Sequence, residues 1–227
     1  MGLNERKCDA GLGRDIHKYL VEKGVETPVL EVSAADFVHD DIKLEIIEAS
    51  FAQILATMGL DLNDDSLTDT PRRMAKMYVD ELFWGLNPNH FPKCTVIENK
   101  MRYDEMVLER DITVMSTCEH HFVTIHGVAH VAYIPDKWVL GLSKMNRVVE
   151  YFARRPQVQE RLTEQVYYAM QHILRTDNIA VVIDAEHYCV KSRGVEDANS
   201  TTLTSKLGGL FKTEPELRAE FMNLLRK

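Results

Sequence analysis

The stretch Cys118-Glu119-His120-His121, together with the later stretch His187-Tyr188-Cys189, decides how the rest of the chain is interpreted. These seven positions hold two of the four cysteines and three of the nine histidines. Thiolate and imidazole are ligands that zinc accepts in tetrahedral geometry. The two stretches therefore predict a metal site. The alternative is a pair of buried thiols beside core histidines.

The spacing of these residues limits the ligand set. Cys118 and His121 have two residues between them, so a single turn can present both to one ion. If the second stretch is a strand, His187 and Cys189 point to the same face, and either could complete the set. Three protein ligands leave a position for water and make a catalytic site, whereas a fourth makes a structural one. Spacing alone leaves both possibilities open.

Hydrophobic periodicity predicts an α+β architecture with no internal repeat. In the clearest strand, residues 121–134, alternate positions face opposite ways, which places His126 and His130 on the side away from His121. Strands are also expected at 94–98, 106–116, 179–183 continuing to Cys189, and 199–205. Helices are expected near 16–20, over 41–58 and from 70 to the turn at Gly85, then from 143, from 158 and from about 213. The predicted division is an N-terminal arm with a short helix (1–40), a helical N-terminal region (41–92) and a C-terminal domain (93–227) that contains the predicted metal residues. His17 and His39, both in the arm, are expected to be solvated.

Composition limits the classes of partner. The chain has 227 residues and a net charge of −8, so broad electrostatic attraction to nucleic acid or to an anionic membrane is not expected. No transmembrane segment or signal peptide is visible in the sequence. With two cysteines in metal-like contexts, a reducing cytoplasmic location is predicted. An anionic substrate would require a locally basic pocket.

Several motifs in the same order resemble the GTP cyclohydrolase I family. The likeness covers nearly everything from about residue 41 to the end. The motifs are Thr70-Pro71 with Arg73 and Lys76, Cys118-Glu119-His120-His121-Phe122, Gly141-Leu142-Ser143-Lys144 with Arg147, Arg155-Pro156-Gln157-Val158-Gln159-Glu160-Arg161-Leu162, His187-Tyr188-Cys189-Val190-Lys191 with Arg193, and Leu207-Gly208-Gly209-Leu210-Phe211.

The resemblance implies a T-fold, in which a four-stranded antiparallel sheet carries two antiparallel helices on one face and follows an N-terminal helical region. In that family, five subunits close their sheets into a barrel and two such rings stack. The expected assembly is therefore a homodecamer with active sites between subunits. Closure of the barrel would remove the exposed edges of the single sheet.

The resemblance also implies that Cys118, His121 and Cys189 are the protein ligands of a catalytic Zn²⁺. Zinc lowers the pKa of bound water to about 7. The implied reaction is hydrolysis of GTP at guanine C8, release of formate and rearrangement to 7,8-dihydroneopterin triphosphate. This is the first step of pterin and folate biosynthesis, carried out in the family by an allosteric enzyme.

The remaining site residues carry over from the same motifs. His120 and His187 are the candidate proton carriers, with His187 favoured as the acid at N7. Glu160 resembles the guanine anchor, Gln159 would contact the base, and Ser143 would act near the ribose. The triphosphate would be held by Arg73, Lys76, Lys144, Arg147 and Arg193, with Arg73 and Lys76 coming from a neighbouring subunit.

Three other interpretations compete with this one. A zinc deaminase acting on another purine would use a glutamate beside a ligand as a proton shuttle, and Glu119 has such a place, although Cys-x-x-Cys is absent. T-fold relatives without zinc are disfavoured by Cys118 and Cys189. A ring-shaped scaffold clamped by zinc would contain the metal but convert no GTP.

Overall fold

The structure is a computed structural model that describes residues 7–30 and 40–226. The described residues form two compact units, one within 28–84 and the other made of 7–27 with 85–226. The three-part division expected from the sequence stays a prediction, and His39 lies outside the described residues. No helix in the described part is long and apolar enough to cross a membrane.

The first unit contains two helical segments. Helix α2 (Asp40–Thr57) corresponds to the predicted helix at 41–58. Helix α3 (Thr70–Lys76) continues as the π-helix η2 (Met77–Leu82) instead of remaining regular up to Gly85. The stacked rings of Phe51 and Tyr78, with centroids 5.5 Å apart, connect α2 to η2. An ion pair between Arg72 and Glu48 (2.8 Å) connects α2 to α3.

The second unit is built on a five-stranded sheet in the order β5-β2-β3-β6-β7. Its long strands are β2 (Val107–Cys118), β3 (Thr124–Tyr133), β6 (Ile179–His187) and β7 (Thr202–Leu207), all paired antiparallel. The two-residue β5 (Pro156–Gln157) pairs parallel with the end of β2. The α+β class is confirmed, and β5 is a short addition to the four strands expected. A separate ribbon joins β1 (Val96–Glu98) to β4 (Trp138–Leu140).

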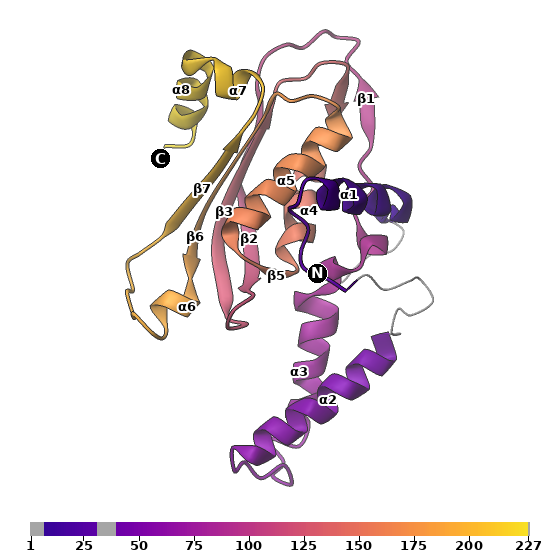
Figure 1. Cartoon of the computed structure of the whole chain (residues 1–227), viewed down its shortest axis with the longest axis vertical. Helices are drawn as coiled ribbons and strands as arrows, with labels where there is room; N and C mark the ends of the chain where they lie inside the picture. Colours follow the sequence, from indigo (N-terminus) through magenta and orange to yellow (C-terminus); the bar gives the residue numbers. More distant parts are fainter. Residues whose placement is uncertain (1–6, 31–39, 227) are drawn as a thin grey trace. The chain divides into compact units, whose positions relative to one another are not determined.

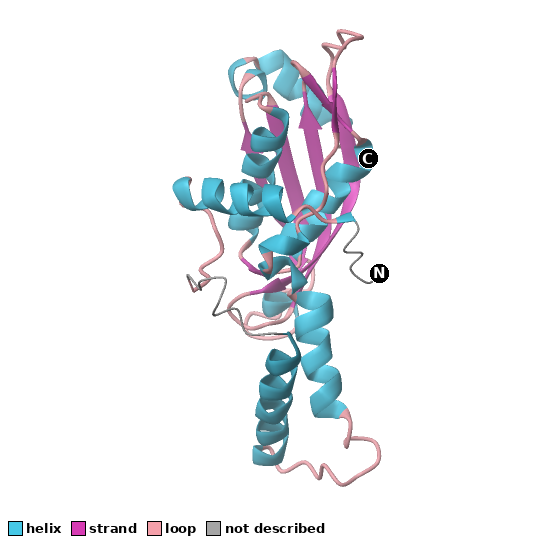
Figure 2. Ribbon diagram, turned by 90° about the vertical axis from the view of Figure 1, so that its right-hand side faces the viewer, coloured by secondary structure: helices cyan, strands magenta, loops and turns pink. Residues whose placement is uncertain are grey.

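Helices α4 (Leu142–Ala153) and α5 (Gln159–Leu174) lie over one face of this sheet (Figures 1 and 2). Alternation along β3 explains which side chains they cover, because successive residues point to opposite faces. Ile125, Ala129, Val131 and Tyr133 are at most 1% exposed, whereas His126 on the other face is exposed. The predicted orientation of β3 is therefore confirmed. This packing fixes the ends of β2 and β6, from which the candidate site projects.

The opposite face is covered near the C-terminal end of the chain. Helices α7 (Leu210–Thr213) and α8 (Pro215–Leu224) bring Phe211 and Phe221 onto Ala132, Ala180 and Val182. The two rings meet edge to face with centroids 5.5 Å apart. These side chains form a second small core, so this end of the sheet is buried on both faces.

Helix α1 (Ala10–Glu22) is a packed part of the second unit. Ile16 and Leu20 are buried at 1% and 0% exposure, and Tyr19 donates a hydrogen bond of 2.7 Å to Gln171 on α5. His17, which we expected to be solvated, lies 2.8 Å from the Glu26 carboxylate. The short helix in the arm is confirmed, but residues 7–27 are anchored because their apolar stripe is buried against α5.

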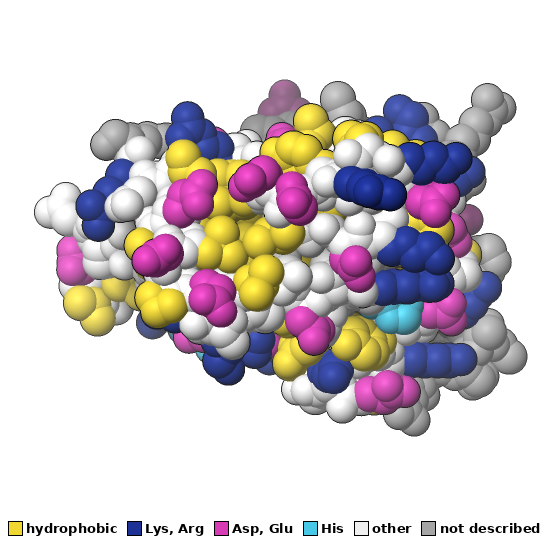
Figure 3. Space-filling view, turned by 90° about the horizontal axis from the view of Figure 1, so that it is seen from above, with side chains coloured by type: hydrophobic (Ala, Val, Ile, Leu, Met, Phe, Trp, Pro, Cys, Tyr) yellow, Lys and Arg dark blue, Asp and Glu magenta, His cyan; other side chains and the backbone are white. Residues whose placement is uncertain are grey.

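Charge is spread unevenly over the surface. On the face shown in Figure 3, acidic side chains border a hydrophobic area, and basic side chains gather toward one side. A chain with a net charge of −8 can therefore still present a local cluster of cations.

Candidate metal centre and active site

The first part of the site is the tight turn between β2 and β3. Its backbone closes through hydrogen bonds from Phe122 N to Cys118 O (2.9 Å) and from Cys118 N to Val123 O (2.8 Å). Phe122 has a φ of 53°, in the left-handed region that bulky residues rarely adopt. This geometry turns Cys118 inward, where it is 3% exposed, and leaves His120 and His121 exposed.

The second part begins where β6 ends, and here one expectation was wrong. Cys189 does not continue the strand but lies in the single-turn helix α6 (Tyr188–Lys191). The reason is the lack of a partner strand: His187 is opposite Ile125 at the start of β3, and β7 pairing stops at Ala185. Without neighbours to accept its backbone hydrogen bonds, the chain closes them locally as a helical turn.

The two parts meet in a cluster of ligand atoms. One atom each from Cys118, His121 and Cys189 lies within 4.8 Å of the others, and this is the one such group of three among the residues described. Both cysteines are free thiols. Two thiols and one imidazole are a donor set that suits zinc. The geometry therefore brings together the three ligands that the family resemblance implied.

The electrostatics of the cluster also fit a cation. Burial, followed by the facing thiol of Cys118, raises the pKa of the Cys189 thiol above its ordinary value. Burial and the neighbouring Cys118 thiol therefore favour the uncharged form of Cys189, and the charge of Arg193 partly opposes them. A divalent ion would reverse this preference, because coordinated thiols lose their protons.

Arg193 lies directly against the cluster. Its Nη1 donates to Nε2 of His121 at 2.7 Å. A metal bound through Nε2 would require Arg193 to release this nitrogen, whereas binding through Nδ1 would not. Either way, the guanidinium stands beside the metal ligands, in position to meet an anionic group.

His187 is oriented by Gln159. The Gln159 side chain is 1% exposed, and its Nε2 donates to the backbone oxygens of Ile183 (3.0 Å) and Thr202 (2.7 Å). Its Oε1 must therefore face His187 Nε2, 2.7 Å away, and accept a hydrogen bond. Because Nε2 of His187 then carries the hydrogen, Nδ1 is the ring atom that can take up or release a proton.

Glu160 follows Gln159 in the first turn of α5, and its side chain is exposed. Burial lowers the pKa of His187, and the Glu160 carboxylate opposes that effect. The carboxylate therefore lies within electrostatic range of the imidazole. The start of α5 thus supplies a positioned amide and an exposed carboxylate beside the metal ligands.

Glu119 is already engaged by a cation. Its carboxylate oxygens lie 2.5 and 3.3 Å from two nitrogens of Arg161 on α5. A carboxylate held in a two-point ion pair is poorly suited to shuttle protons, so the deaminase interpretation loses its proposed residue. The sequence analysis gave no role to Arg161. Its position directly after Glu160, together with the acidic Glu119 in the turn, was the only sequence signal for this ion pair.

Other predicted residues lie elsewhere in the same unit. Ser143, Lys144 and Arg147 are on the first half of α4, whereas the end of α4 leads into β5 beside Cys118. Ala153 is nine positions after Lys144, which corresponds to about 14 Å along the helix. A single unit therefore does not bring these cations to the metal ligands.

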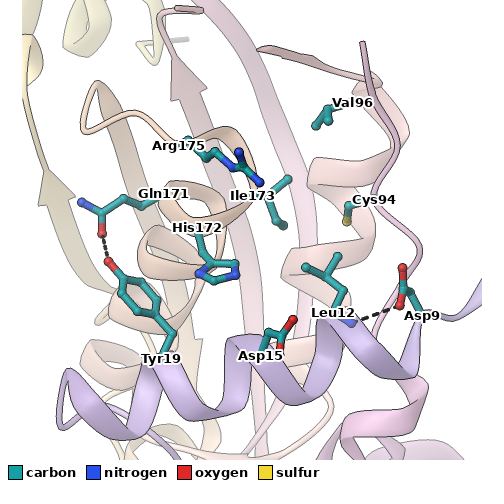
Figure 4. A pocket seen from close by; sticks show the side chains of 10 residues that line it. All are labelled: Asp9, Leu12, Asp15, Tyr19, Cys94, Val96, Gln171, His172, Ile173 and Arg175. Atoms are coloured by element: carbon teal, nitrogen blue, oxygen red, sulfur yellow. Dashed lines mark hydrogen bonds between the residues drawn. The ribbon is translucent and has the colours of Figure 1, made fainter. Parts of the chain in front are cut away.

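A cavity of ≈ 540 Å³ lies elsewhere in the same unit. It is bounded by α1, by Cys94 and Val96, and by the C-terminal end of α5 at His172 and Arg175 (Figure 4). Burial raises the pKa of Cys94 to about 12, partly offset by the charges of Lys144 and Arg147. The two cations therefore lie near Cys94. The distance from His172 to Glu160 along α5 is about 18 Å.

Arg73 and Lys76 belong to the unit of residues 28–84. Both are exposed on α3. Arg73 is held by Ser66 O (3.2 Å), Thr70 Oγ1 (3.1 Å) and the Asp69 carboxylate (3.8 Å). Lys76 makes no such contact with the residues that the structure describes.

Comparison of the sequence with known proteins assigns the chain to a family. The sequence profile described as GTP cyclohydrolase I matches residues 47–226. The chain is 55% identical over 211 residues to GTP cyclohydrolase 1 of Klebsiella pneumoniae, covering 93% of this chain and 94% of that protein. It is 56% identical over 207 residues to the Aeromonas salmonicida protein of that name (91% and 93% covered) and over 210 residues to that of Shewanella loihica (92% and 96% covered).

Proposed function

The chain belongs to the GTP cyclohydrolase I family, and from this premise we propose how its own residues carry out the reaction on GTP. The protein is a GTP cyclohydrolase, an enzyme of the first step of pterin and folate synthesis. The main observation that locates the active site is the cluster of Cys118, His121 and Cys189, which lies beside His187 and Glu160. The proposed reaction hydrolyses guanine at C8, releases formate and leads to 7,8-dihydroneopterin triphosphate.

The proposed metal is Zn²⁺, held by Cys118, His121 and Cys189. When bound, it would act as a Lewis acid that activates water at neutral pH. The choice of zinc over other ions rests on two sulfur ligands and one nitrogen ligand. Cys118 is buried and His121 exposed, so the ligand set opens toward solvent on one side, where a substrate could approach.

The protein's proton carrier at N7 is proposed to be His187. C8 of a neutral purine is a weak electrophile, and protonation at N7 strengthens it. Gln159 keeps the hydrogen on Nε2, so Nδ1 would deliver the proton and later recover it. Gln159 would therefore act mainly by orienting His187, because its amide is already used by the protein. His120, with Nδ1 3.8 Å from Cys118 Sγ, is the second candidate.

Glu160 is proposed to select guanine. One carboxylate can accept hydrogen bonds from N1–H and from the 2-amino group, a pattern that adenine does not offer. The exposure of the side chain at the start of α5 leaves it available for a base. Guanine would then be held on the same side as His187.

We expect Glu160→Gln to lower kcat/KM for GTP by about 30- to 1,000-fold, since a paired, charge-assisted contact contributes about 2 to 4 kcal/mol. The amide of glutamine would place an N–H group opposite one of the two N–H donors of guanine, and no hydrogen bond can form between two donors. Steady-state kinetics with GTP and with inosine triphosphate, which lacks the 2-amino group, would measure the effect. Glu164→Gln is the matched control, because Glu164 is one turn further along α5 and pairs with Lys206. Equal losses in both variants would contradict the proposed role.

The triphosphate is proposed to be bound by residues of more than one subunit. Arg193 lies at the metal cluster, whereas Lys144 and Arg147 lie near Cys94, at the other end of the unit. Because Lys144 and Arg147 lie away from the metal ligands of their own unit, a complete site would need a neighbouring copy of the chain. Ser143 would then act near the ribose, and Arg73 and Lys76 would also come from a neighbouring subunit. The proposed assembly is the two stacked pentamers that the resemblance implies, in which the open edge of β7 would be covered.

A direct assay tests the function. Incubation with GTP should release formate and a fluorescent pterin in equal amounts; a strong chelator should stop both, and added Zn²⁺ should restore them. A zinc-clamped scaffold protein would bind the metal but convert no GTP. Absence of both products with metal-loaded protein would therefore overturn the proposed reaction. The predicted cytoplasmic location stays a prediction.

A further inference from the structure

We propose that Gln165, acting through Gln157, is a positioning residue that ties the metal-binding turn to the N-terminal segment Val25–Thr27. The inference rests on the proposed metal site. It also gives a role to a part of the chain that precedes the residues matched by the family profile, 47–226. A continuous series of hydrogen bonds runs through the core from the turn to that segment.

The series starts at the backbone of the metal-binding turn. Strand β5 pairs with the end of β2, with Cys118 opposite Gln157. The next residue, Glu119, donates its backbone N–H to Gln157 O at 3.0 Å. The position of the Cys118 backbone is therefore coupled to that of Gln157.

The side chain of Gln157 leads away from the turn into the core. It is completely buried, and its Nε2 donates to Phe152 O (2.8 Å) and to Gln165 Oε1 (2.7 Å). The carbonyl of Phe152 can only accept, so it fixes which end of the amide faces Gln165. The contact between the two glutamines therefore has one consistent direction.

Gln165 continues the series to the N-terminal segment. It is also completely buried, and its Nε2 donates to Val25 O (3.0 Å) and Thr27 Oγ1 (3.1 Å). Each of its two amide ends thus has a separate partner, one on the turn side and one on the N-terminal side. No other side chain in the described part of the chain joins Gln157 directly to that segment.

The segment itself is rigidly held. The Glu26 carboxylate accepts hydrogen bonds from Arg155 Nη1 (2.5 Å) and Thr27 N (2.7 Å) and lies 2.8 Å from His17 Nδ1. Arg155 also donates its Nε to Gly85 O at 2.7 Å. Although burial opposes ionisation, the hydrogen bond from His17 and the charge of Arg155 lower the pKa of Glu26. Glu26 and Arg155 are therefore each held by more than one partner, which stiffens this segment.

Stiffness matters here because the metal ligands come from separate elements. Cys118 ends β2, whereas Cys189 lies on α6, a helix whose N-terminus has no side-chain cap. Their ligand atoms approach within 4.8 Å only while the turn keeps its place. The Gln165–Gln157 contact anchors the turn from the core side, so its loss should weaken metal binding beyond its effect on overall stability.

The test compares Gln165→Met with Gln171→Met in the full-length protein. Methionine is similar in size to glutamine but lacks the amide. Gln171 also joins α1 to α5, through Tyr19, but has no contact with Gln157. Zn²⁺ affinity would be measured by equilibrium competition with a chromophoric chelator, alongside the melting temperature. We expect Gln165→Met to weaken Zn²⁺ binding by about 10-fold or more, and Gln171→Met by less than about 2-fold.

A milder variant guards against failure of Gln165→Met to fold. Thr27→Val removes one acceptor of Gln165 with little change in shape, and we expect Zn²⁺ binding to weaken by about 3-fold. Wild-type affinity in both Gln165→Met and Thr27→Val, or an equal loss in Gln171→Met, would overturn this inference alone. A wild-type protein that binds no Zn²⁺ would overturn the metal site, and with it the inference.

Discussion

Replacing Cys118 by serine should remove bound Zn²⁺ and lower kcat/KM for GTP by at least about 1,000-fold, because a serine hydroxyl does not ionise at neutral pH and is a poor zinc ligand. Cys118 is the buried member of the ligand cluster, so the change affects the ion directly. Metal content by elemental analysis and product formation from GTP would be measured on the same preparation.

Cys94→Ser is the matched control for this experiment. Cys94 is also a partly buried free thiol, but it lies at the cavity beside α1 and outside the ligand cluster. Its variant should keep its zinc and most of its activity. If Cys118→Ser retained full zinc content and turnover, the assignment of the metal centre would be wrong.

Replacing His187 by asparagine should abolish ring opening while zinc is retained. General acid–base catalysis contributes about 100- to 10,000-fold, and asparagine cannot carry a proton between the enzyme and N7. The loss should appear in kcat and be seen as absence of formate, the product of ring opening. Zinc should stay bound, because the ligand atoms are those of Cys118, His121 and Cys189.

His126→Asn provides the comparison for His187. His126 is exposed on β3, opposite Glu186, and lies on the face that points away from the core. Its substitution should leave formate release within about 2-fold of wild type. Unchanged formate release by His187→Asn would refute the proposed role of His187. His120 would then be the remaining candidate for the proton carrier.

Much of the fold was predictable because side-chain periodicity reports which face of an element is buried. The alternation along β3 predicted which residues face the helices, and His126 and His130 are not part of the ligand cluster that contains His121. His130 is buried, and its Nδ1 accepts a hydrogen bond from Asp111 N at 3.2 Å. Local pattern was sufficient for the face toward α4 and α5, but it did not predict that Phe211 and Phe221 bury Ala132 on the other face.

The sequence by itself determined the chemistry of the centre. Cys118 and His121, together with the later His187-Tyr188-Cys189, pointed to a metal, and the motifs around them pointed to a family that acts on GTP. The tertiary structure decided three further points. Cys189 contributes to the cluster from a helical turn. The Gln159 side chain binds the backbone through its nitrogen and orients His187 through its oxygen. Lys144 and Arg147 lie on the half of α4 that is far from Cys118.

These three points share one physical reason. A residue's type limits what it can bind, but its partners depend on which distant segments end beside it. Strand β6 stops because β3 and β7 offer no further pairing, and Gln159 finds its acceptors on β6 and β7. Availability of a partner is a property of the folded chain, so it could not be read from local sequence.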